Sequence, residues 1–206
     1  NSNVNTSKAY ASASNTLKVS KAIIEANGNV TLKADTNTSA KAEANGKFEA
    51  SIAVIGGLYA ESGSSDETLV DIDDSQIIST TNKVSVLSNS NTHSEAISEK
   101  PASASLYSNA EGLTKATVGG NSEADYQTAK ISISGKSLIA GYKDVEIKAL
   151  NQVSLTSSER AGVTVAAVSG SKSVALAVDH LLTEITLDQD SVLRTSYRNH
   201  HDADDH

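Results

Sequence analysis

The chain has 206 residues, of which 38% are hydrophobic and 3% aromatic, with six Tyr, one Phe and no Trp. This composition excludes a core built on large aromatic side chains, and the net charge of −8 argues against binding to nucleic acid or to an anionic membrane surface. The absence of Cys excludes disulfides and thiolate metal sites, and no apolar run approaches the roughly 20 residues that span a bilayer.

One short apolar spacing occurs three times, in the form apolar-x-small-x3-Val-x-Leu/Val. The copies cover residues 24–32, 78–86 and 147–155. Their central residues are Val30, Val84 and Val153, so the second interval is longer than the first. The spacing predicts one supersecondary unit that repeats and is lengthened by loops.

Apolar residues alternate with Ser, Thr, Lys, Asp or Glu along each unit. In chain order the alternating pairs are Val30/Leu32, Val70/Ile72, Val84/Val86, Ile131/Ile133, Val145/Ile147, Val153/Leu155 and Ile185/Leu187. This period of two predicts strands of about four to six residues, each with one buried face. Pairs such as Asn27-Gly28 and Gly119-Gly120 indicate turns between them.

A second signature comes shortly before the first. Residues 70–77 resemble residues 185–193, and residues 131–138 form a looser copy. Between the signatures lie Ala- and Ser-rich stretches at residues 50–57, 102–106 and 161–168, whose small side chains suit a narrow interior.

Short strands with frequent turns fit either an antiparallel sandwich or a solenoid of parallel strands. Fixed spacing favours an all-β parallel β-helix, because coils stacked about 4.8 Å apart place Val on Val and Ile on Ile. With coils of roughly 20 residues, the chain would form about ten coils with loop insertions. We expect residues 1–206 to be a single β-helix segment, with repeat-like units near 17–70, 71–130 and 131–206. Because the chain starts at Asn1 and contains no Met, we expect a fragment of a much longer array.

The repeats carry a family resemblance in the segments GNVTLKADTNTSAKAEA (28–44), NKVSVLSNSNTHSEA (82–96) and TKATVGGNSEA (114–124). They resemble large repetitive bacterial surface adhesins of the filamentous-haemagglutinin and leukotoxin-type filamentous adhesin group. The resemblance implies a right-handed parallel β-helix that forms an extracellular stalk on a Gram-negative-type bacterium and is exported by an outer-membrane secretion partner. It transfers no catalytic residue and no cofactor to this chain.

Five acidic residues are candidates for metal ligands or for chemistry: Asp71, Asp73, Asp74, Asp188 and Asp190. Calcium ligation is one interpretation, although the repeated G-G-x-G-x-D pattern of a β-roll is missing. Paired carboxylates for sugar cleavage, using Asp73, Asp74 or Asp190, are another. The interpretation that we prefer is a solvated, charged strand face.

Receptor contacts would fall on Tyr residues, because Tyr combines a large contact area with a hydrogen-bonding group. Tyr107 and Tyr126 are the binding candidates, since they bracket the longest expected insertion, residues 101–127. His200, His201 and His206 stand among acidic residues at the end of the chain, where a flexible polar tail is a simpler interpretation than a metal site.

The expected function is a non-enzymatic stalk segment of a secreted or cell-surface bacterial adhesin, with no cofactor. Through its parent protein it would attach cells to a host-surface or matrix glycan or protein, or to biofilm matrix. It would neither bind nucleic acid nor insert into a membrane. The alternatives are a receptor- or glycan-binding module on the same fold, a polysaccharide-active β-helix enzyme, and a calcium-stabilised β-roll.

Overall fold

The computed structural model describes residues 2–46, 49–100, 102–120, 125–160 and 162–195. These residues form thirteen β-strands, and none of their segments is a helix long and apolar enough to cross a membrane. In chain order the strands are β1 (Ser2–Ser20), β2 (Ile23–Ala26), β3 (Val30–Asn45), β4 (Glu49–Asp73), β5 (Gln76–Ser79), β6 (Lys83–Glu99), β7 (Ser103–Val118), β8 (Gln127–Ser134), β9 (Leu138–Gly141), β10 (Asp144–Arg160), β11 (Thr164–Asp179), β12 (Leu181–Leu187) and β13 (Val192–Thr195).

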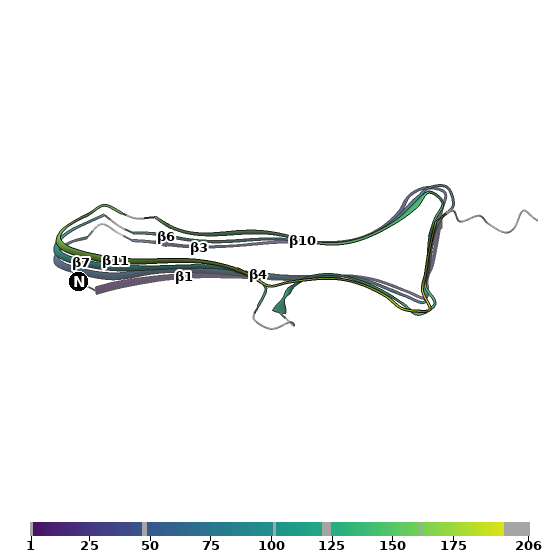
Figure 1. Ribbon diagram of the computed structural model, residues 1–206, viewed down its shortest axis with the longest axis horizontal. Coiled ribbons are helices and arrows are strands. Elements are labelled where there is room, and N and C mark those ends of the chain that lie inside the picture. Colours follow the sequence, from purple (N-terminus) through teal and green to yellow (C-terminus); the bar gives the residue numbers. More distant parts are fainter. Residues whose placement is uncertain (1, 47–48, 101, 121–124, 161, 196–206) are drawn as a thin grey trace, which may run out of the picture.

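The strands form three sheets in which every described pairing is parallel. The six-stranded sheet has the order β11-β7-β4-β8-β12, with β1 beside β4, the three-stranded sheet is β10-β6-β3, and the four-stranded sheet is β13-β9-β5-β2. The chain passes through the six-stranded, four-stranded and three-stranded sheets in turn and then begins the next coil (Figure 1). This confirms the prediction of an all-β parallel β-helix.

Each coil is much longer than the length of roughly 20 residues expected from the sequence. Val30 pairs with Val84 and Val84 with Val145, so the sequence intervals between successive coils are 54 and 61. The described chain therefore makes three complete coils and most of a fourth instead of about ten. The coils are long because Ala, Ser and Thr continue the strand pattern through segments without large apolar residues. The six-stranded and three-stranded sheets, which we call the two long sheets, consequently contain strands of 16 to 25 residues wherever no connection interrupts them.

The second signature is confirmed by the strand register. Val70 pairs with Ile131, and Ile131 pairs with Ile185, so the three copies stack on one another. Leu17 pairs with Val70 and begins a copy in the first coil that the sequence analysis missed.

The third copy of the first signature is misplaced by the sequence spacing. Val153 pairs with Thr92, whereas the partner of Val84 is Val145, eight residues earlier. The error arises because apolar residues recur with period two along β10, so the pattern alone fits this strand in more than one register.

The apolar core lies at the end of the coils that the four-stranded sheet closes. There the two long sheets diverge, as Figure 1 shows, and leave room for branched side chains. Residues at the centre of this core are fully buried, with Val70, Ile77, Val84, Ile131 and Ile139 all at 0% exposure. Burial of branched apolar side chains in continuous ladders is the main stabilising contribution in this region.

Over the rest of their length the two long sheets run close together (Figure 1). Small side chains fill the space between them, including a cluster of buried alanines. Hydroxyl groups also pair across the interior: Ser62 and Ser94 lie 2.7 Å apart, and Thr68 donates to Thr36 at 2.6 Å. These bonds satisfy polar groups whose burial without a partner would be unfavourable.

A buried carboxylate belongs to this polar interior. Asp66 is 2% exposed and accepts hydrogen bonds from the hydroxyls of Thr38 at 2.7 Å and Thr92 at 2.9 Å. The side chain of Gln127, also fully buried, accepts from the Asp66 amide at 2.7 Å and donates to Thr92 and Ser90. The network joins the two long sheets across three coils, and hydroxyl donors surround the carboxyl group of Asp66.

The apolar ladders end at the fourth coil, where no further described coil covers the apolar side chains. Ile185 is 48% exposed, although its partner Ile131 is fully buried. Leu187 and Leu193 are also more than 40% exposed. The last described coil therefore ends in an apolar face and in strand edges that no described strand covers.

Candidate functional site

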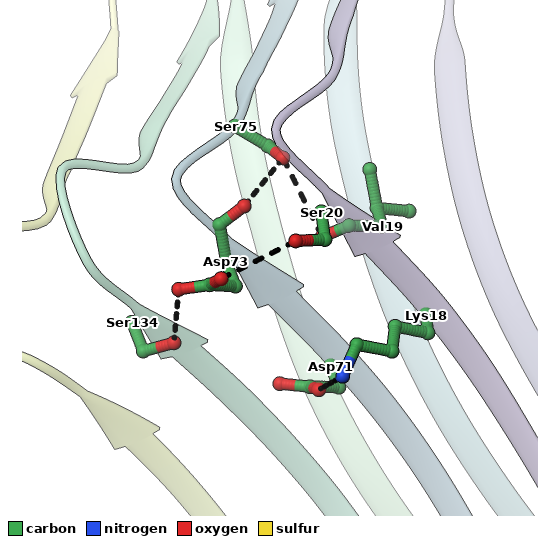
Figure 2. Close-up of polar contacts among 7 residues, drawn as sticks. All are labelled: Lys18, Val19, Ser20, Asp71, Asp73, Ser75 and Ser134. Carbon is green, nitrogen blue, oxygen red and sulfur yellow. Dashed lines mark hydrogen bonds and ion pairs between the residues drawn. The ribbon is translucent and has the colours of Figure 1, made fainter.

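Three of the predicted acidic residues lie at the corner where β4 turns toward the four-stranded sheet. Figure 2 shows the Asp73 carboxylate between two hydroxyls, with Ser20 donating to one oxygen at 3.3 Å and Ser134 to the other at 3.2 Å. Because Ser20 belongs to the first coil and Ser134 to the third, Asp73 connects three successive coils. Asp71 faces outward and forms an ion pair with Lys18 at 3.5 Å (Figure 2).

Asp74 lies close to Asp73, because the Oδ1 atoms of Asp74 and Asp73 both stand within 3.0 Å of the position that a Cβ on Gly135 would take. Asp74 has a positive φ of 45° and accepts from the Lys136 amide at 3.0 Å. Asp188 occupies the same corner in the fourth coil and accepts from the Gln189 amide at 2.7 Å, and Asp190 follows it in the same turn. No group of three or more His, Asp or Glu side chains among the described residues is arranged to hold a metal ion. In this geometry, the carboxylates act as capping and bridging acceptors at a corner.

The two candidate tyrosines lie far apart. Tyr107 is near the start of β7, 42% exposed, in register with Ala53. Tyr126 lies beyond the other end of β7, where its ring stacks on His180 with centroids 5.5 Å apart and planes 18° apart. The stretch of strand from Tyr107 to the end of β7 extends over about 36 Å, so the two rings do not form one binding surface. His200, His201 and His206 lie outside the described residues.

The inserted residues are fewer than the expected 101–127, because most of that range is the regular strand β7. Strand β4 pairs with β7 at the shorter sequence interval of 54, as in Ala53 and Tyr107, and with β8 at the longer interval of 61, as in Val70 and Ile131. The third coil therefore carries seven extra residues between Val118 and Gln127. In Figure 1 the described parts of this connection lie outside the six-stranded sheet, on the side away from the three-stranded sheet.

A groove of about 490 Å³ lies on the outer face of the six-stranded sheet beside this connection. Its centre is a column of outward positions from the four coils, occupied by Tyr10, Gly63, Thr117 and Val178. A Cβ added to Gly63 would lie 2.8 Å from the ring of Tyr10 and 3.0 Å from the hydroxyl of Thr117. The absence of a side chain at Gly63 thus creates the floor, and the Tyr10 ring lies against it.

The wall of the groove is held by backbone hydrogen bonds. Gly119 donates to the Ser64 carbonyl at 2.8 Å, and the His180 carbonyl accepts from Gln127 at 3.0 Å. Gly119 has a φ of +72°, and an added Cβ would overlap the His180 carbonyl oxygen, so both conformation and space require glycine here. Gly119 and Gln127 are accordingly held at fixed points on the sheet.

Charges alternate along the neighbouring outward column. Glu61 pairs with Lys8 of the first coil at 2.9 Å and with Lys115 of the third at 3.9 Å. The hydrogen bond from Lys8 lowers the pKa of Glu61 below its ordinary value, a hydrogen bond from Tyr10 acts in the same direction, and burial opposes both. The Glu61 carboxylate is therefore held ionised at neutral pH.

Comparison with protein-family models, with curated proteins and with solved structures gives no match to this chain.

Sequence reasoning did not find Tyr10, Glu61 and Gly63 as parts of one site. The signal that would have found them is the coil length, because the register pairs Tyr10 with Gly63 in one column and Lys8 with Glu61 in the column beside it. With coils of about 20 residues, these positions fall in unrelated parts of the helix.

Proposed function

We propose that this chain is a non-enzymatic stalk segment of a bacterial surface adhesin, which holds a binding region away from the cell. The observation that carries the proposal is the continuous stacking of long coils, in which each coil covers the apolar ladder of the one before it. In a repeat fold of this kind, length grows by adding coils and stability grows with the number of interfaces.

Ion pairs between coils favour one register of stacking. Opposite charges meet between successive coils at Lys41 and Glu95 (3.4 Å), and at Lys130 and Glu184 (2.7 Å). Each exposed pair contributes little stability. If one coil shifted by one residue relative to the next, these charges would move apart and the apolar side chains would turn outward. The charges and the apolar residues together therefore disfavour misregistered coils.

The extracellular location, the outer-membrane secretion partner and attachment to host or matrix through the parent protein rest on the resemblance of the repeat segments at residues 28–44 and 82–96. Antibodies raised against this chain should label intact cells of the bacterium that produces it and should reduce their attachment. Labelling only after permeabilisation would refute the surface location.

The mechanical role is tested by pulling the chain between two handles in single-molecule force spectroscopy. Coils that open one at a time should each release about 180–220 Å of extended chain, as follows from sequence intervals of 54 and 61 per coil. Extension at low force without such steps would refute a load-bearing role. Turnover of an acidic polysaccharide that is lost in Asp73→Asn would support the enzyme alternative instead.

A further inference from the structure

The groove beside residues 119–120 is where the third coil departs from the regular stacking. Insertions in repeat proteins lie on the surface and are a common place for binding residues, because the regular scaffold holds them in position. Here the connection stands next to the column that contains Tyr10 and Gly63, so a flat sheet face becomes a hollow with a wall. Its volume of about 490 Å³ falls in the range of about 300–1,000 Å³ that is usual for small-molecule sites.

The floor of the hollow offers an aromatic surface to solvent. Tyr10 is 64% exposed, and its ring is restrained on the side where it lies against Gly63. A restrained aromatic ring costs little conformational entropy when a ligand binds to it. The adjacent Thr117 hydroxyl donates to the Ser62 carbonyl at 3.1 Å, which fixes the neighbouring part of the floor.

The rim carries hydrogen-bonding groups of mixed charge. Glu61 and Lys115 form an ion pair, the side chain of Asp125 lies on the wall, and Ser12 and Ser65 line the same hollow. The His180 ring is held in place by its stacking on Tyr126. Acceptors and donors thus surround an aromatic face, with two carboxylates and one ammonium group among them.

We propose that this groove binds a neutral saccharide, with one face of a pyranose ring on Tyr10 and its hydroxyls on the polar rim. A pyranose has an apolar C–H face and a periphery of hydroxyls, so it matches an aromatic platform enclosed by carboxylate, ammonium and hydroxyl groups. A peptide side chain would need a deeper apolar pocket, and a sulfated sugar would meet Glu61 and Asp125. This inference goes beyond the proposed stalk function and does not depend on it.

The test is saturation-transfer NMR with four neutral disaccharides, lactose, cellobiose, maltose and N,N′-diacetylchitobiose, and with one sulfated heparin disaccharide. We expect saturable binding of at least one neutral sugar, weakened at least tenfold by Tyr10→Ala. Tyr107→Ala is the matched control, because it removes another exposed tyrosine from the same sheet outside the groove, and it should bind as the parent does. Far-UV circular dichroism and melting curves establish that each variant is folded.

A second variant covers the case in which Tyr10→Ala does not fold. Gly63→Ala places a methyl group on the floor and displaces the Tyr10 ring, and it should weaken binding while leaving every charged group in place. The proposal is overturned if no neutral sugar binds, if only the sulfated disaccharide binds, or if the groove variants bind as well as Tyr107→Ala.

Discussion

The stacked-ladder account predicts that the cost of truncating an isoleucine depends on whether the next coil covers it. Ile131 is 0% exposed, with Val70 of the second coil on one side and Ile185 of the fourth on the other. Truncating a buried isoleucine to alanine costs about 2–5 kcal/mol through lost burial and the cavity left behind. Because Ile131 has a neighbour on each side, we expect Ile131→Ala to lower the free energy of unfolding by about 3–4 kcal/mol.

Ile185→Ala is the matched control, because it removes the same atoms from the same ladder at a position that is 48% exposed. Its cost should be about half as large, roughly 1.5–2 kcal/mol, since half of the side chain is already in water. Urea unfolding followed by far-UV circular dichroism measures both values. Equal costs for the two variants, or a larger cost for Ile185→Ala, would refute the assignment of the covered and uncovered ends of the ladder.

Three further predictions concern the polar interior and the charges. Asp66→Ala should lower the melting temperature and cost about 2–4 kcal/mol, because it leaves the buried hydroxyls of Thr38 and Thr92 without their acceptor; an unchanged melting curve would argue against a buried network. Gly112→Ala should destabilise the coils at the end away from the four-stranded sheet, because the new methyl would overlap the Glu159 carboxylate, which is buried in an ion pair with Lys100 at 2.7 Å. Gly28→Ala is the control, because there is open space at its Cβ, and its melting temperature should be close to that of the parent. Because the pKa of Glu61 is lower in the folded state than its unfolded-state value of about 4.5, Glu61 stabilises the fold at pH values above 4.5, and this stability is lost as the pH falls from there through the folded-state pKa. Glu61→Gln should therefore make the loss of stability with falling pH shallower in that range. An identical acid profile would contradict the ion-pair ladder.

The parallel β-helix could be predicted because stacked coils repeat their inward apolar residues. The match of Val70, Ile131 and Ile185 was visible in the sequence and is correct in register. The length of a coil could not be predicted from these stacked residues, because they lie only at the end of each coil that the four-stranded sheet closes. The strands continue through stretches in which Ser62 and Ser94 face each other, and inward serines look the same in sequence as loop residues.

The candidate site was harder to predict from the sequence for the same reason. Tyr107 and Tyr126 were chosen by their position around an expected insertion, and the register shows that a regular strand separates them. The groove depends on Tyr10 lying across Gly63, a residue one full coil further along the chain. Their contact follows only from the coil length, and no local pattern contains it.

The most direct test of the account is the distance between spin labels at Lys18 and Thr186. The chain contains no Cys, so two introduced cysteines would be labelled specifically. Both positions face outward in one column that runs through Asp71 and Ser132, which places their Cα atoms three strand spacings apart, about 14 Å. Pulsed and continuous-wave electron paramagnetic resonance should find the labels about 15–20 Å apart. A separation of about 40 Å, as expected for coils of roughly 20 residues, would contradict the account.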